Sequence, residues 1–168
     1  MTGLNPDIDV ILEIATIITD ANLNILEQGP VHVIHQPEQA IEQMIPKVYD
    51  LHMYSGLVQA VRSSRTTLFQ AQSDTLAFIK KYAPEKHTAY LAGNSVWQDR
   101  AFLRKYMSAI TDHLHYRLLD VTSFKVALNA WYPHQKSGGY KKTDKHRALD
   151  DIKESIGELA FYKRHFLK

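Results

Sequence analysis

The 168-residue chain contains no cysteine. Disulfide bonds, zinc–thiolate sites and thiol nucleophiles are therefore excluded, and the composition fits a reducing compartment. The sequence also lacks an apolar run of membrane-spanning length and lacks a basic segment followed by an apolar one near its start. Neither a membrane span nor a secretion signal is predicted. We expect a cytoplasmic protein with no membrane partner.

A large excess of charge of either sign is missing as well. The formal net charge is +2, which is too small to identify a nucleic-acid binder but is compatible with a locally basic groove. Hydrophobic residues make up 45% of the chain and charged residues 23%, which indicates a globular protein with a buried core. At this length we expect one domain spanning residues 1–168.

Strands and helices alternate along the chain after an initial hairpin. Asp9–Thr19 is rich in isoleucine and predicts a strand, and Ile25–His35 predicts a second strand with an irregularity at Gly29-Pro30. The later predicted segments are strands at Thr88–Ala92 and Arg117–Val121, helices at Thr66–Tyr82, Trp97–Met107 and about Arg147 to His165, a helix ending near Trp131, and a mobile basic loop over Pro133–Lys145. This order predicts an α/β domain with a mixed sheet, in which ligands usually bind where strands end and helices begin.

Asp99 is the first candidate for chemistry. It follows a predicted strand and the segment Gly93-Asn94-Ser95, and it opens a predicted helix. A carboxylate there can reach the end of the sheet, where a hard cation such as Mg²⁺ accepts oxygen ligands. The alternative is a surface aspartate that stabilises the first helical turn through the helix dipole, and for one motif taken alone this is the commoner role.

His146 and the pair Asp150-Asp151 form the second candidate. A histidine near carboxylates can deprotonate a water that a metal has polarised. The alternative is a basic helix start whose acidic residues are simply solvated. If His146 lies inside the helix, Asp150 at i+4 shares its face, and if it lies in the preceding loop, Asp151 is equally suitable. Spacing alone leaves both open.

Tyr116 and Arg117 form the third candidate, because an arginine can bind phosphate through two parallel hydrogen bonds. The alternative is an aromatic packing residue beside a surface cation, which is the commoner case for either residue alone.

Together these segments resemble the oligoribonuclease branch of the DEDDh exonucleases. The matching segments, in the family's order, are Met1–Leu4, Glu13–Thr16, Thr19–Leu26, Ser55–Val58, Gly93–Ser95 with Gln98–Arg100, His115–Arg117 with Leu119–Val121, and His146–Ile152 with Glu154-Ser155. Several ordered motifs are more specific than any one of them. The resemblance implies an RNase H-like α/β fold with a mixed sheet flanked by helices. It also implies a 3′→5′ exoribonuclease that hydrolyses very short oligoribonucleotides, such as dinucleotides, to nucleoside monophosphates by a two-metal mechanism with Mg²⁺ or Mn²⁺.

The resemblance also assigns roles to residues. Asp99 matches the metal ligand of the family's second motif, and His146 matches the general base. The family pattern His-x-Ala-x-x-Asp selects Asp151 over Asp150 as the metal ligand of the third motif. Tyr116 matches a tyrosine that family members present to the partner subunit's active site, which implies a homodimer.

Further residues match the family's contacts with short RNA. Leu4 matches a leucine that wedges against the substrate bases, and Lys47 stands where many relatives have an aromatic residue near the substrate pocket. The remaining matches are Ser95, Arg117 and Thr122 for the terminal 5′ phosphate, with Thr122 at a usual serine position, and His52 and Ser55 for the substrate pocket.

The family's first motif, Asp-x-Glu, directly precedes the segment that matches Met1–Leu4, and these 168 residues contain no counterpart of it. By resemblance, that motif supplies two acidic ligands and the first, central strand of the sheet. We therefore expect the natural polypeptide to begin upstream of Met1 and the 168-residue form to be poorly active. Two other hypotheses are a non-catalytic, dimeric nucleotide-binding remnant and a related DEDDh exonuclease acting on longer RNA or DNA.

Overall fold

The computed structural model describes residues 1–133, Tyr140 and residues 146–167. The elements are β1 (Glu13–Thr19), β2 (Ile25–Val33), α1 (Glu38–Glu42), α2 (Pro46–Tyr54), α3 (Leu57–Ser63), α4 (Leu68–Tyr82), β3 (Leu91–Gly93), α5 (Val96–Tyr106), α6 (Ser108–Thr111), β4 (Leu118–Asp120), α7 (Val121–Trp131) and α8 (Ala148–His165). The basic loop predicted over Pro133–Lys145 lies outside the described residues except for Pro133 and Tyr140.

The predicted hairpin is confirmed as the antiparallel pair β1 and β2. Ala15 pairs with Val31, but two residues further along β1 Ile17 pairs with Gln28, three residues back along β2. The extra residue lies at Gly29-Pro30, where the sequence predicted an irregularity, because proline cannot donate to the ladder.

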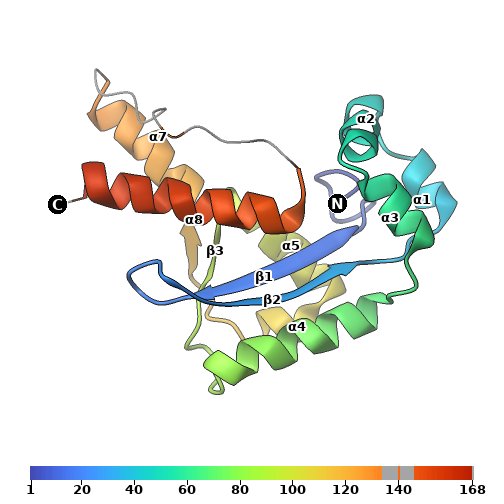
Figure 1. Cartoon of the computed structure of the whole chain (residues 1–168), viewed down its shortest axis with the longest axis horizontal. Coiled ribbons are helices and arrows are strands. Elements are labelled where there is room, and N and C mark those ends of the chain that lie inside the picture. The colour runs from blue at the N-terminus through green and yellow to red at the C-terminus, as the bar shows by residue number, and fades with distance from the viewer. Residues whose placement is uncertain (134–139, 141–145, 168) are drawn as a thin grey trace.

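Helix α4 covers one face of this hairpin, and α8 lies on its other side (Figure 1). Ala71, Thr75 and Ile79 are the buried residues of α4, and their spacing of four places them on one face of the helix. A Cβ atom at Gly29 would clash with the Phe78 ring, so the helix approaches β2 this closely only over a glycine.

Strands β3 and β4 form a second, parallel pair, in which Leu91 lies opposite Leu118 and Gly93 opposite Asp120. Both strand directions therefore occur, which confirms the α/β class, although the described strands form two two-stranded sheets. Between the two sheets and α8 lies a cavity of about 90 Å³ lined by apolar side chains that include Ile17, Leu119 and Ile156.

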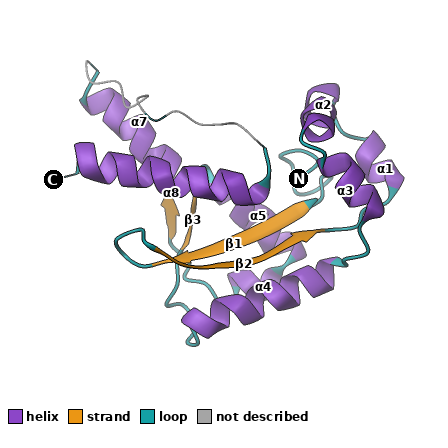
Figure 2. Cartoon of the chain, in the orientation of Figure 1, coloured by secondary structure: helices purple, strands orange, loops and turns teal. Residues whose placement is uncertain are grey.

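Helices surround the strands on both sides (Figure 2) and bury three apolar clusters. One joins α4, α5 and α6, a second joins α1 and α3 to the start of the hairpin, and a third joins α7 to α8. The sequence did not delimit α1, α2 and α3, whereas α4, α5, α7 and α8 agree with prediction within a few residues. In the described part of the chain, no helix is both long and apolar enough to cross a membrane.

Candidate active site

Asp99 lies in the first turn of α5, with its side chain largely withdrawn from solvent. The pKa of its carboxyl is raised to about 6, chiefly by burial and to a smaller extent by the nearby charges of Asp120 and Asp151, while a hydrogen bond to backbone and the α-amino group of Met1 act in the opposite direction. The Asp99 carboxylate therefore has little water and little positive charge around it. In such a setting a bound cation stabilises the ionised form of the carboxyl group.

Asp150 and Asp151 both lie in the first turn of α8, but they face different neighbours. The charge of Asp151 acts on Asp99 of α5, whereas the charge of Asp150 acts on the guanidinium of Arg147. Successive residues of a helix point about 100° apart, so only one of the pair can face α5. The geometry thus favours Asp151 as the partner of Asp99.

Glu13 of β1 holds the start of α8 in place. Its carboxylate accepts hydrogen bonds from Arg147 Nε at 3.1 and 3.2 Å, from Arg147 Nη2, and from the backbone N–H of Ala148 at 2.8 Å. Only 4% of the Glu13 side chain is exposed, whereas 33% of the Arg147 side chain is, so the carboxylate is enclosed and the guanidinium is partly hydrated. The sequence analysis gave Glu13 no role, although Glu13 opens the segment Glu13–Thr16 that resembles the exonuclease family.

His146 stands immediately before α8, with a backbone φ of 54°. This left-handed conformation is uncommon for a residue other than glycine and is found disproportionately at functional sites. The positive charge that His146 can carry lowers the pKa of His52, which shows that the two imidazoles lie near one another. The structure therefore brings the predicted base close to the predicted substrate pocket.

His52 is buried in α2, and burial is the main cause of its lowered pKa. Its Nε2 is 2.9 Å from the carbonyl oxygen of Met1, and its own carbonyl accepts a hydrogen bond from the Ser55 hydroxyl at 3.3 Å. Within the described residues, its Nδ1 atom is buried without a hydrogen-bond partner. A neutral imidazole that keeps one ring nitrogen unpaired has an atom available for a ligand.

A buried network fixes the start of α5 against α8. The Asn94 side chain donates to Ser155 Oγ at 3.1 Å and to Glu158 Oε2 at 3.0 Å. The hydroxyl of Tyr162 donates to the other Glu158 oxygen at 2.6 Å, and burial together with this bond raises the pKa of Tyr162. Because these side chains are enclosed, the network resists displacement of Asp99 relative to Asp151.

Ser95 and Thr122, two of the residues predicted to contact phosphate, lie together. The backbone N–H of Ser95 donates to Thr122 Oγ1 at 2.9 Å and to Asp120 Oδ1 at 3.0 Å, and the two hydroxyls are 3.2 Å apart. Asp120 also accepts from the N–H of Thr122 at 2.9 Å. Sequence reasoning missed Asp120, whose carboxylate joins the starts of α5 and α7.

Tyr116, Arg117 and Leu4 project into solvent. Tyr116 is 67% exposed and stacks on the His115 ring at 4.6 Å, while the Arg117 guanidinium lies 5.4 Å from the Tyr116 ring. Leu4 is 74% exposed and is linked to α5 only through its carbonyl, which accepts from the Gln98 amide. Across the described residues, no hydrogen bond joins these side chains to Asp99, Ser95 or His146.

The donor set fits two ligands of a divalent cation. Carboxylate oxygens from Asp99 and Asp151 are the ligands that hard cations prefer, and the raised pKa of Asp99 is what a bound cation would reverse. In the part of the chain that the structure describes, no three His, Asp or Glu side chains are grouped so as to hold a metal ion.

Known proteins similar to this chain all point to one family. Residues 1–159 match the exonuclease family RNase_T. The oligoribonuclease of Actinobacillus succinogenes is 47% identical over 168 residues, which cover all of this chain and 91% of that protein. The oligoribonuclease of Pseudomonas syringae pv. tomato is 48% identical over the same 168 residues, covering 92% of that protein, and that of Haemophilus influenzae strain PittGG is 46% identical, covering 91%.

Proposed function

The chain belongs to the exonuclease family, and from that premise we propose that it is an oligoribonuclease, a 3′→5′ exoribonuclease that degrades very short RNA to nucleoside monophosphates. The observation that carries the function is the identity of 47% over all 168 residues to a protein named oligoribonuclease. Asp99, Asp151 and His146 give this activity a chemical basis, because they gather two carboxylates and an imidazole at the starts of α5 and α8.

The residues proposed for hydrolysis lie at the N-terminal ends of α5 and α8. Asp99 and Asp151 would hold a divalent cation, Mg²⁺ or Mn²⁺, which would supply charge neutralisation at the scissile phosphodiester and acidify the attacking water. His146 accepts the proton of that water at a ring nitrogen while the water oxygen bonds to phosphorus. The 3′ oxygen of the preceding nucleotide leaves and takes up a proton, and a nucleoside 5′-monophosphate is released. Glu13 and Glu158 position these groups without touching substrate.

Recognition of short RNA uses residues beside this centre. Ser95 and Thr122 present hydroxyls 3.2 Å apart, and Arg117 supplies a guanidinium for the terminal 5′ phosphate. His52 and Ser55 line the substrate pocket, and the exposed Leu4 side chain packs against the bases. A site that binds both ends of its substrate favours substrates short enough to reach both.

We also propose that the chain assembles as a homodimer, which the position of Tyr116 supports. Its ring is 67% exposed and stacked on His115, so it is held rigidly while facing outward. A tyrosine presented in this way is suited to reach a second copy of the chain. Mixing a Tyr116→Ala protein with a His146→Ala protein is expected to restore part of the activity that each lacks, since one site of each mixed dimer is then complete.

The central experiment compares RNA substrates with and without metal. Release of monophosphate from a diribonucleotide is expected with Mg²⁺ or Mn²⁺ and is expected to stop in EDTA. A single strand of about twenty nucleotides is expected to be degraded more slowly, because binding it needs an extended groove. Equal or faster degradation of the longer RNA or of DNA would favour the related exonuclease function instead.

A second candidate function is a non-catalytic, dimeric nucleotide-binding protein. The observation that favours it is that no three His, Asp or Glu side chains of the described residues are grouped so as to hold a metal ion. Isothermal titration would then show binding of the diribonucleotide that is unaffected by metal, with no monophosphate released. Turnover that depends on metal and on Asp151 would exclude this function.

Two sequence-based expectations stay predictions. One is that residues 1–168 form a single exonuclease domain, for which one cooperative unfolding transition followed by two probes is expected. The other is the cytoplasmic location, which fractionation of the source cells would check.

A further inference from the structure

His115 has no role in the proposed hydrolysis, yet it contacts both Tyr116 and Arg117. It lies in the loop that leads into β4, which begins at Leu118. Its imidazole stacks on the Tyr116 ring, with the ring centroids 4.6 Å apart and the two planes at 26°. Its Nδ1 accepts a hydrogen bond from the backbone N–H of Arg117 at 3.0 Å. One side chain therefore contacts, through different atoms, two residues that the proposed function assigns to RNA.

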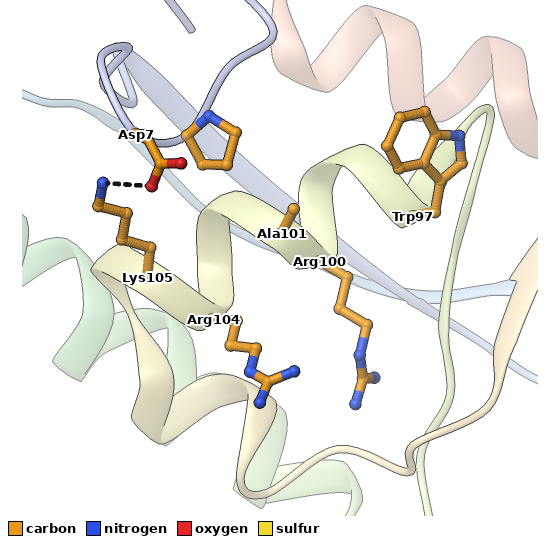
Figure 3. A pocket seen from close by; sticks show the side chains of 7 residues that line it. Asp7, Trp97, Arg100, Ala101, Arg104 and Lys105 are labelled. Carbon is orange, nitrogen blue, oxygen red and sulfur yellow. Dashed lines mark hydrogen bonds and ion pairs between the residues drawn. The ribbon is translucent and has the colours of Figure 1, made fainter.

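The backbone of His115 is anchored through both of its polar groups. Its N–H donates to the carbonyl oxygen of Ala89 at 2.8 Å, in the segment that leads into β3. Its carbonyl oxygen accepts a hydrogen bond from Arg100 Nη1 at 3.1 Å. Arg100 belongs to the outer face of α5, away from the carboxylate centre, and Figure 3 shows its guanidinium and that of Arg104 projecting away from Trp97. Contacts from two separate elements thus fix the backbone that carries the imidazole.

Tyr90 gives the imidazole a second aromatic contact. The centroids of the Tyr90 and His115 rings are 4.7 Å apart, with the planes tilted by 41°. The Arg117 guanidinium extends the series, because it lies 5.4 Å from the centroid of the Tyr116 ring. Both tyrosines are largely exposed, so enclosure does not restrict their rotation. Contact with the His115 ring instead favours one orientation of the Tyr116 side chain over the others open to an exposed tyrosine.

We propose that His115 is a positioning residue for the recognition of short RNA: its ring orients Tyr116, and its Nδ1 fixes the backbone of Arg117. The inference rests on the proposed function, which assigns Tyr116 and Arg117 to the substrate. A side chain that must be ordered when the complex forms weakens binding by a few-fold to roughly tenfold. The contacts of His115 avoid that loss, because both neighbours are oriented before RNA arrives. His115 acts only through these two residues.

Two substitutions separate the two contacts of the imidazole. His115→Phe keeps an aromatic ring against Tyr116 but has no acceptor for the N–H of Arg117. His115→Asn places an amide oxygen where Nδ1 stands but has no ring. Each is expected to weaken the binding of 5′-phosphorylated diadenylate roughly fivefold, measured by isothermal titration of the full chain in EDTA, where no hydrolysis interferes. The matched control is His165→Asn, which removes an imidazole stacked on Phe161 at 4.4 Å at the end of α8, and it should change binding less than about twofold.

Double variants show whether His115 acts through its neighbours. In a Tyr116→Ala protein, His115→Asn is expected to weaken binding less than about twofold further, because the residue that the ring orients is already gone. In an Arg117→Ala protein, His115→Phe is likewise expected to have little further effect. A merely structural role for His115 would instead weaken binding by the same factor in every background. Both substitutions leave the backbone contacts of residue 115 intact, so the variants are expected to fold.

The outcomes separate this proposal from the proposed function. Fivefold losses in the single variants that vanish in the double variants would support the role of His115. Losses that multiply in both double variants, or single variants that bind as the parent protein does, would overturn it. A parent protein that binds diadenylate but does not hydrolyse it when Mg²⁺ is added would overturn the hydrolytic function and leave the role of His115 to be decided by the binding cycles. A parent protein that does not bind it would overturn both.

Discussion

The inner and outer faces of α5 place opposite charges in opposite surroundings. On the inner face, Asp99 is enclosed with Asp120 and Asp151 nearby, and burial raises its pKa to about 6. On the outer face, Trp97 is 60% exposed, and two guanidinium groups line an open trough. Burying the Asp99 carboxylate on the inner face costs free energy, and its position depends on the buried contacts around it. The side chains of the outer face stay hydrated, so placing them there costs little free energy. The helix therefore separates an enclosed, acidic face from an open, basic one.

The largest effect on the rate of hydrolysis is expected from replacing a carboxylate on the inner face of α5. Asp151→Asn should lower the rate of diribonucleotide hydrolysis with Mg²⁺ by roughly 10³-fold, because the amide can no longer hold the cation that stabilises the reacting phosphate. Asp150→Asn is the matched control, since that neighbour acts on Arg147 instead, and it should change the rate less than about threefold. The reverse order of the two rates would show that Asp150 is the ligand.

The next largest effect, on the free energy of unfolding, is expected at Glu13, which holds the start of α8 in place. Glu13→Gln leaves the Arg147 guanidinium without its carboxylate, and we expect a loss of about 3 kcal/mol in the free energy of unfolding, measured with urea. Glu38→Gln removes a similar bidentate partner from Arg62, but the Glu38 side chain is 50% exposed, and a much smaller loss is expected. Equal losses for the two variants would mean that enclosure of Glu13 contributes nothing.

Asp99 is expected to make the metal-free protein less stable as the pH rises. Its folded-state pKa of about 6 exceeds the ordinary 3.8, so between these values the folded chain holds a proton that the unfolded chain has released. The free energy of unfolding in EDTA should therefore fall from pH 4 to pH 6, by at most about 3 kcal/mol. Asp99→Asn should remove this fall and be more stable than the parent at pH 7. If the free energy of unfolding of Asp99→Asn changed with pH in the same way as that of the parent protein, the raised pKa of Asp99 would be contradicted.

The smallest effects are expected on the outer face. Trp97→Phe and Arg104→Ala should each change the free energy of unfolding by less than about 0.5 kcal/mol, because neither side chain is enclosed. Their rates of diribonucleotide hydrolysis should stay within about twofold of the parent protein. Stability losses similar to that of Glu13→Gln would abolish the contrast between the two faces.

The sequence was most informative where residues repeat with a clear period. The spacing of Ala71, Thr75 and Ile79 predicted α4, and the proline at position 30 predicted the irregularity in β2. Helices α1, α2 and α3 were not delimited, because they are short and begin at Pro37, Ile45 and Gly56 without a side-chain cap. Such helices form because the second apolar cluster encloses them, and a local pattern does not record that.

The residues of the candidate site also fall into two groups, those that the sequence identified and those that it did not. Asp99, His146 and Asp151 were identified because each stands beside a predicted helix start or within a family motif. Glu13 and Asp120 were missed, because their importance lies in contacts with distant residues: Glu13 meets Ala148, 135 positions away, and Asp120 meets Ser95, 25 positions away. A sequence read from one end to the other gives no local sign of such contacts.

The docking of α8 against β1 has a consequence for how the protein is made. The Glu13 contacts with Arg147 and Ala148 join the first strand to the last described helix. During synthesis, residues 1–147 leave the ribosome before any residue of α8 can reach that strand. The start of α8, with Asp151, therefore docks late. On the roles proposed for His146 and Asp151, a nascent chain is not yet able to cut RNA beside the translating ribosome.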